Sequence, residues 1–487
     1  MDAVTDKGPP YNYRALLPPM NGSEGLRKLA HMAAFWPALL LPWLTPGQAM
    51  GIAFGLVLMN LFILPRFATT LYRSQEPGRG ALEIVLYPCA VMTTLAAFGL
   101  VQERAAEWVG GGIHTAPAWY LPVAAAWFGL AFVDACIGIA CRVVPRGPTF
   151  PWNPRKPMLS VGLGVLVACL PAWILVQWAM PAALASWGWA WLIGLLVLCA
   201  LAETAWFGIA DNIVIPFSLS VAIPFLPSSL LFTTAQMENL SVLSGDWMMP
   251  VATVLIPIGF GIAAYAAGLL TLGGAILGGL LALILILANP WLFAFLCGFF
   301  IFGNLATRLG SKNKHAQGIA EPRAGRRGAA EVFGAMGLAV WMTPLIHLAR
   351  SASDEIMHHA LLVCIAPLIA KTMDTVSSEI GKALAGRTWS LSTFRQVKPG
   401  TNGAVSLAGT FWGLLAAAGL AMPILALHWG SSKDLGVLLG IALIANLFEA
   451  YWKAWAAPRG MDQGAHTNVL MTLVAAILAW VWWFGLG

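Results

Sequence analysis

Residues 374–409 read DTVSSEIGKALAGRTWSLSTFRQVKPGTNGAVSLAG, and apolar segments flank this stretch on both sides. It contains two carboxylates, several hydroxyls, several cations and a loop rich in Gly and Asn. Polar and ionisable groups are costly next to lipid and usually serve a function there. This stretch is therefore the candidate site, and the rest of the chain is interpreted as its scaffold.

The composition indicates a membrane protein, because 59% of the 487 residues are hydrophobic and only 10% are charged. Apolar runs of about 20 residues, long enough to cross a bilayer as a helix, recur along the chain. They predict an all-α polytopic integral membrane protein with roughly twelve to fourteen transmembrane helices. Representative runs are 49–64, 122–141, 161–179, 187–202, 251–270, 272–297 and 471–483.

Most basic residues, which give the chain a net charge of +6, lie in short loops. The positive-inside rule places such loops in the cytoplasm, as in a plasma or inner membrane protein if the source is bacterial. Nucleotides are also cytoplasmic, whereas nucleic acid is not expected as a partner, because the loops are short and adjoin membrane spans. The loops are 66–79, 142–156, 308–327 and 382–398.

A helix is predicted around the start of the candidate site. Four polar residues spaced i, i+3, i+7 and i+11 share one of its faces, with Ser377 beside them: Lys371, Asp374, Ser378 and Lys382. A carboxylate with nearby hydroxyls suits Mg²⁺, so Asp374 and the second carboxylate, Glu379, are both assigned to a metal.

The loop after this helix has the features of a phosphate cradle. Its two glycines let the backbone approach an anion closely, and a helix N-terminus is predicted directly after it. The order GxxxxGK[ST] of a Walker A loop is absent. Phosphoryl or nucleotidyl transfer mainly requires positioning and charge neutralisation, which these residues could supply. The residues assigned to nucleotide and phosphate are Ser377, Ser378, Lys382, Lys398, Gly400, Thr401, Asn402, Gly403 and Ser406.

A simpler interpretation of the same residues is structural. Asp374 and Glu379 could form ion pairs with Lys371 and Lys382, as is common at helix ends, while the glycine loop only reverses the chain.

Isolated charges in apolar runs mark further candidate residues. Asp134 lies alone in an apolar helix and should have a partner or bind an ion. Glu203 and Glu449 lie in apolar runs as well, and Asp211 follows Glu203. Near the N-terminus a cluster of cations is interpreted either as a positive-inside anchor or as part of a site: Arg27, Lys28 and His31.

The two halves of the chain look like diverged copies. A cation pair, an Asp, a Lys-Pro pair and a Glu occur in the same order in both halves. Repeats also occur in transporters, so repetition alone does not indicate an enzyme. The predicted organisation is a polar segment (1–24), a first membrane domain (25–227), a connector (228–250) and a second membrane domain (251–487). The matched residues are Asp134 with Asp374, Lys156 with Lys398, and Glu203 with Glu449.

Several motifs also resemble known families. From about residue 263 onward, the chain resembles the membrane family that includes the phytyl-phosphate kinases of tocopherol synthesis. The motifs that carry this resemblance are FFIFGNLATRLGSKNK, GRRG, DTVSSEIGKA and VKPGTNGAVSLAGT. Residues 25–225 are similar to the dolichol kinase and phytol kinase family, and more distantly to phosphatidate cytidylyltransferases. The motifs that carry this similarity are RKLAH, FVDACIG, PWNPRKP and ETAWFGIADNIVIP.

The resemblance implies a bifunctional enzyme. Its first half would phosphorylate an isoprenoid alcohol of the phytol or geranylgeraniol type with CTP or another nucleoside triphosphate, and its second half would convert the monophosphate to the diphosphate. By resemblance, Asp374 holds Mg²⁺, Glu449 is a second ligand or a base, and the catalytic equivalents in the first half are Asp134 and Glu203. The resemblance also implies that Lys156 binds phosphate and that Asp134 and Asp211 bind the metal. The residues implied to bind the substrate phosphate or head group are Arg326, Arg327, Arg27, Lys28 and His31.

Two other functions remain open. One is a CTP-dependent cytidylyltransferase that makes a CDP-lipid, and the other is a lipid or isoprenoid transporter. The oligomeric state is also open, with a homodimer as one alternative.

Overall fold

The computed structural model describes residues 28–29, 31–63, 91, 120–145, 147–150, 153–179, 196–197, 199–200, 202–204, 215, 217, 251–316, 318–319, 325–349, 353–384, 386–459 and 464–485. Within these residues, seven helices are long and apolar enough to cross a membrane, and four shorter apolar helices accompany them. The predicted class, an α-helical polytopic membrane protein, is confirmed. The count of twelve to fourteen spans stays a prediction, because it refers to the whole chain. Arg27, Asp211, the loop 66–79 and the segments 1–24 and 228–250 lie outside the described residues.

The first half of the chain forms apolar helices and one small hairpin. A span over Val123–Val143 consists of two α-helices joined by a π-helical turn, and Asp134 begins the second of them. The elements are η2 (Trp36–Trp43), α2 (Pro46–Leu58), η3 (Met59–Ile63), α6 (Tyr120–Phe128), η7 (Gly129–Val133), α7 (Asp134–Val143), β1 (Thr149–Phe150), β2 (Asn153–Pro157) and α8 (Met158–Ala179).

The second half is a helical bundle with a small sheet at one end. Strands β3, β4 and β5 pair antiparallel in the order β4-β3-β5. The elements are α12 (Val251–Ala266), α13 (Leu272–Ala288), α14 (Pro290–Arg308), α15 (Ser311–Ala316), α16 (Ala329–Trp341), α17 (Pro344–Ala349), α18 (Asp354–Leu384), β3 (Thr388–Ser390), β4 (Gln396–Val397), β5 (Ala404–Val405), α19 (Leu407–Ala421), α20 (Pro423–Ala426), α21 (Ser432–Ala456), η12 (Ala457–Arg459), α22 (Gly464–Trp480) and η13 (Val481–Gly485).

One apolar run differs from the sequence prediction. Residues 272–297 do not form one helix, because the chain breaks between α13 and α14 at Asn289. The Asn289 side chain accepts a hydrogen bond from the Trp291 amide (3.0 Å), and Pro290 occupies the first helical position. Proline has no amide hydrogen to continue α13, but it fits the first turn of a new helix.

Helix α18 is the centre of the second half, and α14, α16, α19, α21 and α22 all pack against it. Its residues 360–370 are buried in an unbroken run. With 31 residues, it is about 46 Å long, whereas the hydrocarbon core of a bilayer is about 30 Å thick. Helix α18 is therefore long enough to reach beyond the hydrocarbon, and its polar residues lie in its C-terminal part.

Both halves contribute to one cluster of buried apolar residues. Phe217 makes edge-to-face contacts with two rings of α16: its centroid lies 4.9 Å from that of Phe333 and 5.8 Å from that of Trp341. Such contacts join the first half to the helix that packs between α13 and α18.

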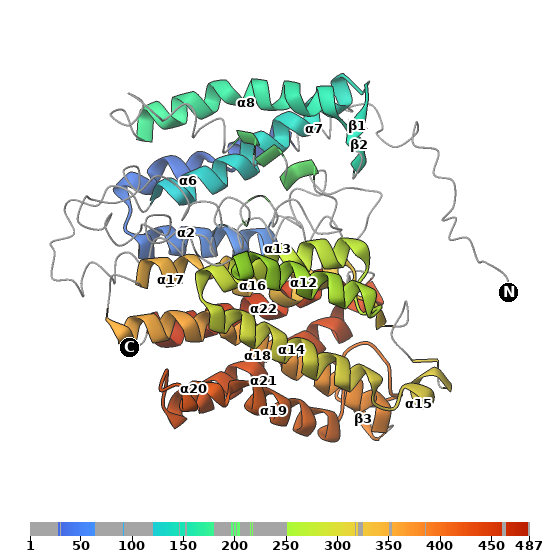
Figure 1. Cartoon of the computed structure of the whole chain (residues 1–487). Coiled ribbons are helices and arrows are strands. Elements are labelled where there is room, and N and C mark those ends of the chain that lie inside the picture. The colour runs from blue at the N-terminus through green and yellow to red at the C-terminus, as the bar shows by residue number, and fades with distance from the viewer. Residues whose placement is uncertain are drawn as a thin grey trace.

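The described basic loops gather at one end of the molecule. Figure 1 shows the β1-β2 hairpin, α15 and β3 at the same end, on the right of the view. These elements belong to the segments 142–156, 308–327 and 382–398, which were expected to face the same side of the membrane. The polar end of α18 and its sheet therefore lie among cationic loops.

Candidate functional site

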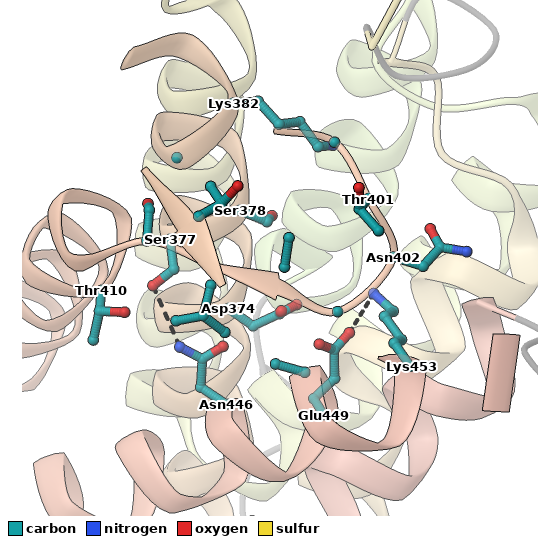
Figure 2. Close-up of a pocket in the computed structure, with 18 of the residues that line it drawn as sticks. Asp374, Ser377, Ser378, Lys382, Thr401, Asn402, Thr410, Asn446, Glu449 and Lys453 are labelled. Carbon is teal, nitrogen blue, oxygen red and sulfur yellow. Dashed lines mark hydrogen bonds and ion pairs between the residues drawn. The ribbon is translucent and has the colours of Figure 1, made fainter. Parts of the chain in front are cut away.

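A cavity of about 410 Å³ lies at the polar end of α18 (Figure 2). Its walls come from α18, the loop before β5, the first turn of α19, the C-terminal part of α21 and the short segment after α15. The lining residues are Gly318, Ile319, Asp374, Ser377, Ser378, Gly381, Lys382, Thr388, Gly400, Thr401, Asn402, Gly403, Ala404, Val405, Ser406, Thr410, Asn446, Glu449, Ala450 and Lys453.

Helix α18 presents one polar face to the cavity. The lining positions on it are spaced i, i+3, i+4, i+7 and i+8, which is the repeat of a single helical face. They are Asp374, Ser377, Ser378, Gly381 and Lys382. Lys371, which the sequence placed on this face, does not line the cavity but donates a hydrogen bond to Asp374 Oδ2 (2.5 Å).

The glycine-rich loop is held against its neighbours at both glycines. Gly400 and Gly403 have φ angles of +84° and +71°, which side chains rarely adopt. A Cβ on Gly403 would lie 2.5 Å from the backbone nitrogen of Ala454 in α21. Within the loop, the Lys398 carbonyl accepts hydrogen bonds from the Thr401 amide (3.2 Å) and hydroxyl (2.7 Å). The loop therefore has a fixed shape along the cavity wall.

Helix α19 begins at the cavity, as the sequence predicted. Ser406 caps it by accepting a hydrogen bond from the Gly409 amide (3.0 Å), and Ser406 and Thr410 line the cavity. The α19 helix packs closely on α18, because a Cβ on Gly413 would lie 2.7 Å from the Met373 carbonyl oxygen. The positive end of the α19 dipole and its first amides favour an anion in this place.

Helix α21 supplies residues that the sequence analysis missed. Asn446, Glu449 and Lys453 line the cavity together, and only Glu449 was assigned. The spacing i, i+3, i+7 from Asn446 puts them on one helical face, so the signal was present in the sequence. Asn446 Nδ2 lies 3.4 Å from Ser377 Oγ, a contact that connects α21 to α18.

Two carboxylates in the cavity each have one oxygen engaged by a lysine. Asp374 is paired with Lys371, and Glu449 with Lys453 of the same helix. Among the described residues, no hydrogen bond reaches Asp374 Oδ1 or Glu449 Oε2. Both side chains line the cavity, although Asp374 is only 6% and Glu449 only 4% exposed. Carboxylate oxygens are ligands that hard divalent cations prefer.

The cation would also need other ligands. The described residues contain no group of three or more His, Cys, Asp or Glu side chains that could hold a metal. Mg²⁺ usually keeps several waters and binds one or two carboxylates together with substrate phosphates. The residues present therefore fit Mg²⁺ that arrives with a polyphosphate.

Glu379, which was assigned to the metal, does not line the cavity. One of its oxygens accepts from Lys314 (2.7 Å) and the other from Lys382 (2.9 Å), and the residue is only 2% exposed. The expected ion pairs of the structural interpretation thus do form. However, Asp374 and Lys382 also line the cavity. Glu379 does not line it, but accepts a hydrogen bond from the Lys382 ammonium group.

The two arginines assigned to the substrate phosphate also lie outside this cavity. The backbone of Arg327 bonds to Leu269 and Thr271, and its guanidinium lies 5.7 Å from the Phe299 ring centroid. Arg326 lies beside Gly268. This backbone bridge fixes both arginines beside α12, α13 and α14. Lys398 is likewise absent from the lining, although its loop is present.

In the first half, the isolated carboxylates have cationic partners, as their burial requires. Asp134 Oδ2 lies 2.9 Å from Lys28 Nζ and 3.3 Å from His31 Nδ1. Lys156 pairs with Glu203. The predicted companions of this cluster, Arg27 and Asp211, lie outside the described residues.

The two halves share a local arrangement around their aspartates. In each, a helix that carries the Asp is followed by short antiparallel strands and a second helix. In each half, a glycine six residues after the first residue of this second helix packs against the helix that carries the Asp. It contacts the residue three positions after the Asp in the sequence. A Cβ on Gly164 would lie 2.7 Å from Ile137 N, and one on Gly413 would lie 3.0 Å from Ser377 Cβ.

Comparisons with known proteins identify one family model and several related proteins. Residues 255–483, which include every residue that lines the cavity, match the family described as Integral membrane protein DUF92. Protein VTE6, chloroplastic, of Arabidopsis thaliana is 36% identical over 160 residues, or 32% of this chain and 47% of that protein.

Two microbial proteins are similar as well. An uncharacterized membrane protein of Synechocystis sp. is 37% identical over 155 residues, or 31% of this chain and 58% of that protein. One of Methanocaldococcus jannaschii is 29% identical over 187 residues, or 38% of this chain and 72% of that protein. The chain thus spans about half the length of the first two relatives. No solved structure matches the chain.

Proposed function

We propose that the cavity is the active site of a membrane phosphotransferase that converts an isoprenyl monophosphate to the diphosphate. The observation that carries this proposal is the convergence of two carboxylates, two lysines and a glycine-rich loop on one cavity beyond the apolar part of α18. The resemblance of DTVSSEIGKA and VKPGTNGAVSLAGT to phytyl-phosphate kinases supports the choice of substrate, because both motifs line this cavity.

The donor is a nucleoside triphosphate, and CTP is the expected one by resemblance. The loop around Gly400 and Gly403 and the first turn of α19 would bind its phosphates through backbone amides. Lys382 and Lys453 would neutralise phosphate oxygens from opposite helices. A volume of about 410 Å³ lies within the range of small-molecule sites.

The reaction needs little proton transfer at this site. A phosphate monoester is largely dianionic near neutral pH, so its oxygen can attack without a general base. A new bond forms from that oxygen to the γ-phosphorus, the bond to the bridging oxygen breaks, and the nucleoside diphosphate leaves. Mg²⁺, when bound, supplies neutralisation of the β- and γ-phosphate charge. Asp374 and Glu449 would hold it through the oxygens that face the cavity.

The first half would carry the preceding step, the phosphorylation of the isoprenoid alcohol. The repeated arrangement of helix, strands and second helix around Asp134 and Asp374 supports a common origin for the two halves. In this proposal, Asp134 and Glu203 have the roles of Asp374 and Glu449, and Lys156 binds phosphate. Both sites would face the cytoplasm with the basic loops.

Product analysis tests the proposal against the alternatives. Purified protein would be incubated with CTP, Mg²⁺ and either phytol, geranylgeraniol or their monophosphates. Formation of CDP and an isoprenyl diphosphate supports the kinase, whereas release of pyrophosphate with a CDP-lipid indicates a cytidylyltransferase. Movement of lipid across liposome membranes without nucleotide turnover would indicate a transporter instead.

Lys453→Met should raise the KM for the nucleotide about tenfold or more, because a hydrogen bond to a charged group contributes about 1.5–3 kcal/mol. Steady-state kinetics with an isoprenyl monophosphate would measure the change. Lys433→Met is the matched control, since Lys433 lies on the same helix but outside the cavity, over the Trp482 ring. Equal effects of both substitutions would contradict the assignment of Lys453.

A further inference from the structure

A buried lysine connects the cavity to a helix that does not line it. Lys371 in α18 is 7% exposed, and its ammonium donates hydrogen bonds to Asp374 Oδ2 (2.5 Å) and to Asn468 Oδ1 (2.7 Å). Asn468 belongs to α22, which contributes no residue to the cavity lining. Lys371 therefore provides a hydrogen-bonded link between Asn468 and a carboxylate that lines the cavity.

The position of Asn468 is fixed by the packing of α22. Thr472, one turn further along this helix, donates to the Gly334 carbonyl of α16 (3.3 Å), and α22 also packs along α18 and α21. The Asn468 side chain thus offers its oxygen to Lys371 from a supported helix. An uncharged amide oxygen accepts the hydrogen bond without adding a second negative charge beside Asp374.

This contact determines how Lys371 shares the oxygens of Asp374. A buried ammonium group requires acceptors for its N–H donors, because an unsatisfied charged donor is costly at low dielectric. Asp374 Oδ2 and Asn468 Oδ1 are two such acceptors. If the oxygen of Asn468 were absent, Lys371 would need another acceptor, and Asp374 Oδ1 belongs to the carboxylate that Lys371 already contacts. If Oδ1 accepted from Lys371, it would no longer be available to the cavity.

We infer that Asn468 is a positioning residue for the cation site: it holds Lys371 so that only one oxygen of Asp374 is engaged and the other faces the cavity. The inference rests on the proposed cation-dependent function. It makes α22 a support of the site, in the way that partners of metal ligands commonly tune metal affinity.

The test is the binding of Mn²⁺, a spectroscopic substitute for Mg²⁺, to full-length protein in detergent, followed by electron paramagnetic resonance of the free ion. Asn468→Leu should weaken Mn²⁺ binding about tenfold or more, as is typical when a partner of a metal ligand is removed. In assays with an isoprenyl monophosphate, the Mg²⁺ concentration for half-maximal rate should rise similarly, while kcat at saturating Mg²⁺ stays within a few-fold.

Two further variants separate positioning from general loosening of the bundle. Asn468→Gln retains an uncharged amide oxygen at the same position of α22 and should bind Mn²⁺ more tightly than Asn468→Leu. Leu473→Ala loosens the packing of the same helix at a buried residue that makes no hydrogen bond to Lys371 or Asn468, and should leave Mn²⁺ binding within a few-fold of the original protein. Wild-type Mn²⁺ affinity in folded Asn468→Leu protein, or an equal loss in Leu473→Ala, would overturn the inference.

Failure of the proposed function would look different. If Asp374→Asn bound Mn²⁺ as tightly as the original protein, the cation site itself would be misplaced, whatever Asn468 does. If Asp374→Asn lost binding and Asn468→Leu did not, the cation site would stand and only the role of Asn468 would be wrong.

Discussion

Asp374→Asn is expected to lower the rate of isoprenyl monophosphate phosphorylation by about 10³-fold, which corresponds to about 4 kcal/mol of transition-state stabilisation. The substitution keeps the size of the side chain but removes the charge that faces the cavity. It also leaves Lys371 as a buried cation beside a neutral amide, so cation binding and local geometry both suffer. Single-turnover assays with excess enzyme would measure the chemical step.

Asp354→Asn is the matched control for this substitution. Asp354 lies in the first turn of the same helix, is exposed, and does not line the cavity. It should therefore have nearly full activity. Retention of the second phosphorylation by Asp374→Asn would contradict the assignment of the site. If alcohol phosphorylation persists in this variant while monophosphate phosphorylation is lost, two separate sites are present.

The polar face of α18 and the loop after it could be predicted from sequence, because both are exceptions in an apolar chain. Charged and hydroxyl residues with helical spacing stand out where lipid or core would otherwise require apolar side chains. Glycines between Lys398 and Ser406 stand out for a different reason, since they permit the left-handed backbone found at Gly400 and Gly403. Local rules were sufficient for these features.

The choice of partners could not be predicted in the same way. Glu379 and Asp374 are five residues apart on one helix, yet Glu379 turns to Lys314 of α15 and Asp374 to the cavity. Arg327 was assigned to the substrate phosphate, and the structure shows it in a backbone bridge with Leu270, with its guanidinium beside Phe299. Such outcomes depend on which helices pack together, which no local pattern specifies.

The relation between the halves draws on both kinds of evidence. The order of Asp, Lys-Pro and Glu is visible in sequence, whereas the equivalent helix contacts of Gly164 and Gly413 require coordinates. The ion pairs of the two halves differ. In the first half Lys156 pairs with Glu203, whereas in the second half Glu449 pairs with Lys453 rather than with Lys398. A shared backbone arrangement with altered ion pairs is expected if two sites diverged toward different acceptors.

Gly403→Ala is expected to reduce kcat/KM for the nucleotide by about 10²-fold, equivalent to about 2.7 kcal/mol. The added Cβ would lie 2.5 Å from Ala454 N and still closer to the Ala450 carbonyl oxygen, and both atoms belong to the backbone of α21. Gly403 also has a φ of +71°, a conformation in which a side chain adds roughly 1–2 kcal/mol of strain. The loop would have to leave α21, and the wall of the cavity would open.

Alanine substitutions at two other glycines should have smaller effects than Gly403→Ala. A Cβ on Gly400 would meet the Ile319 side chain at 2.6 Å, and because a side chain can move, Gly400→Ala should have a smaller effect. Gly386 precedes the same sheet, and a Cβ there would meet nothing within 4 Å, so Gly386→Ala should behave like the original protein. Nucleotide KM, kcat and thermal unfolding would be measured for all three variants. Equal activities of Gly403→Ala and Gly386→Ala would show that the close contact between the loop and α21 is not needed to bind phosphate.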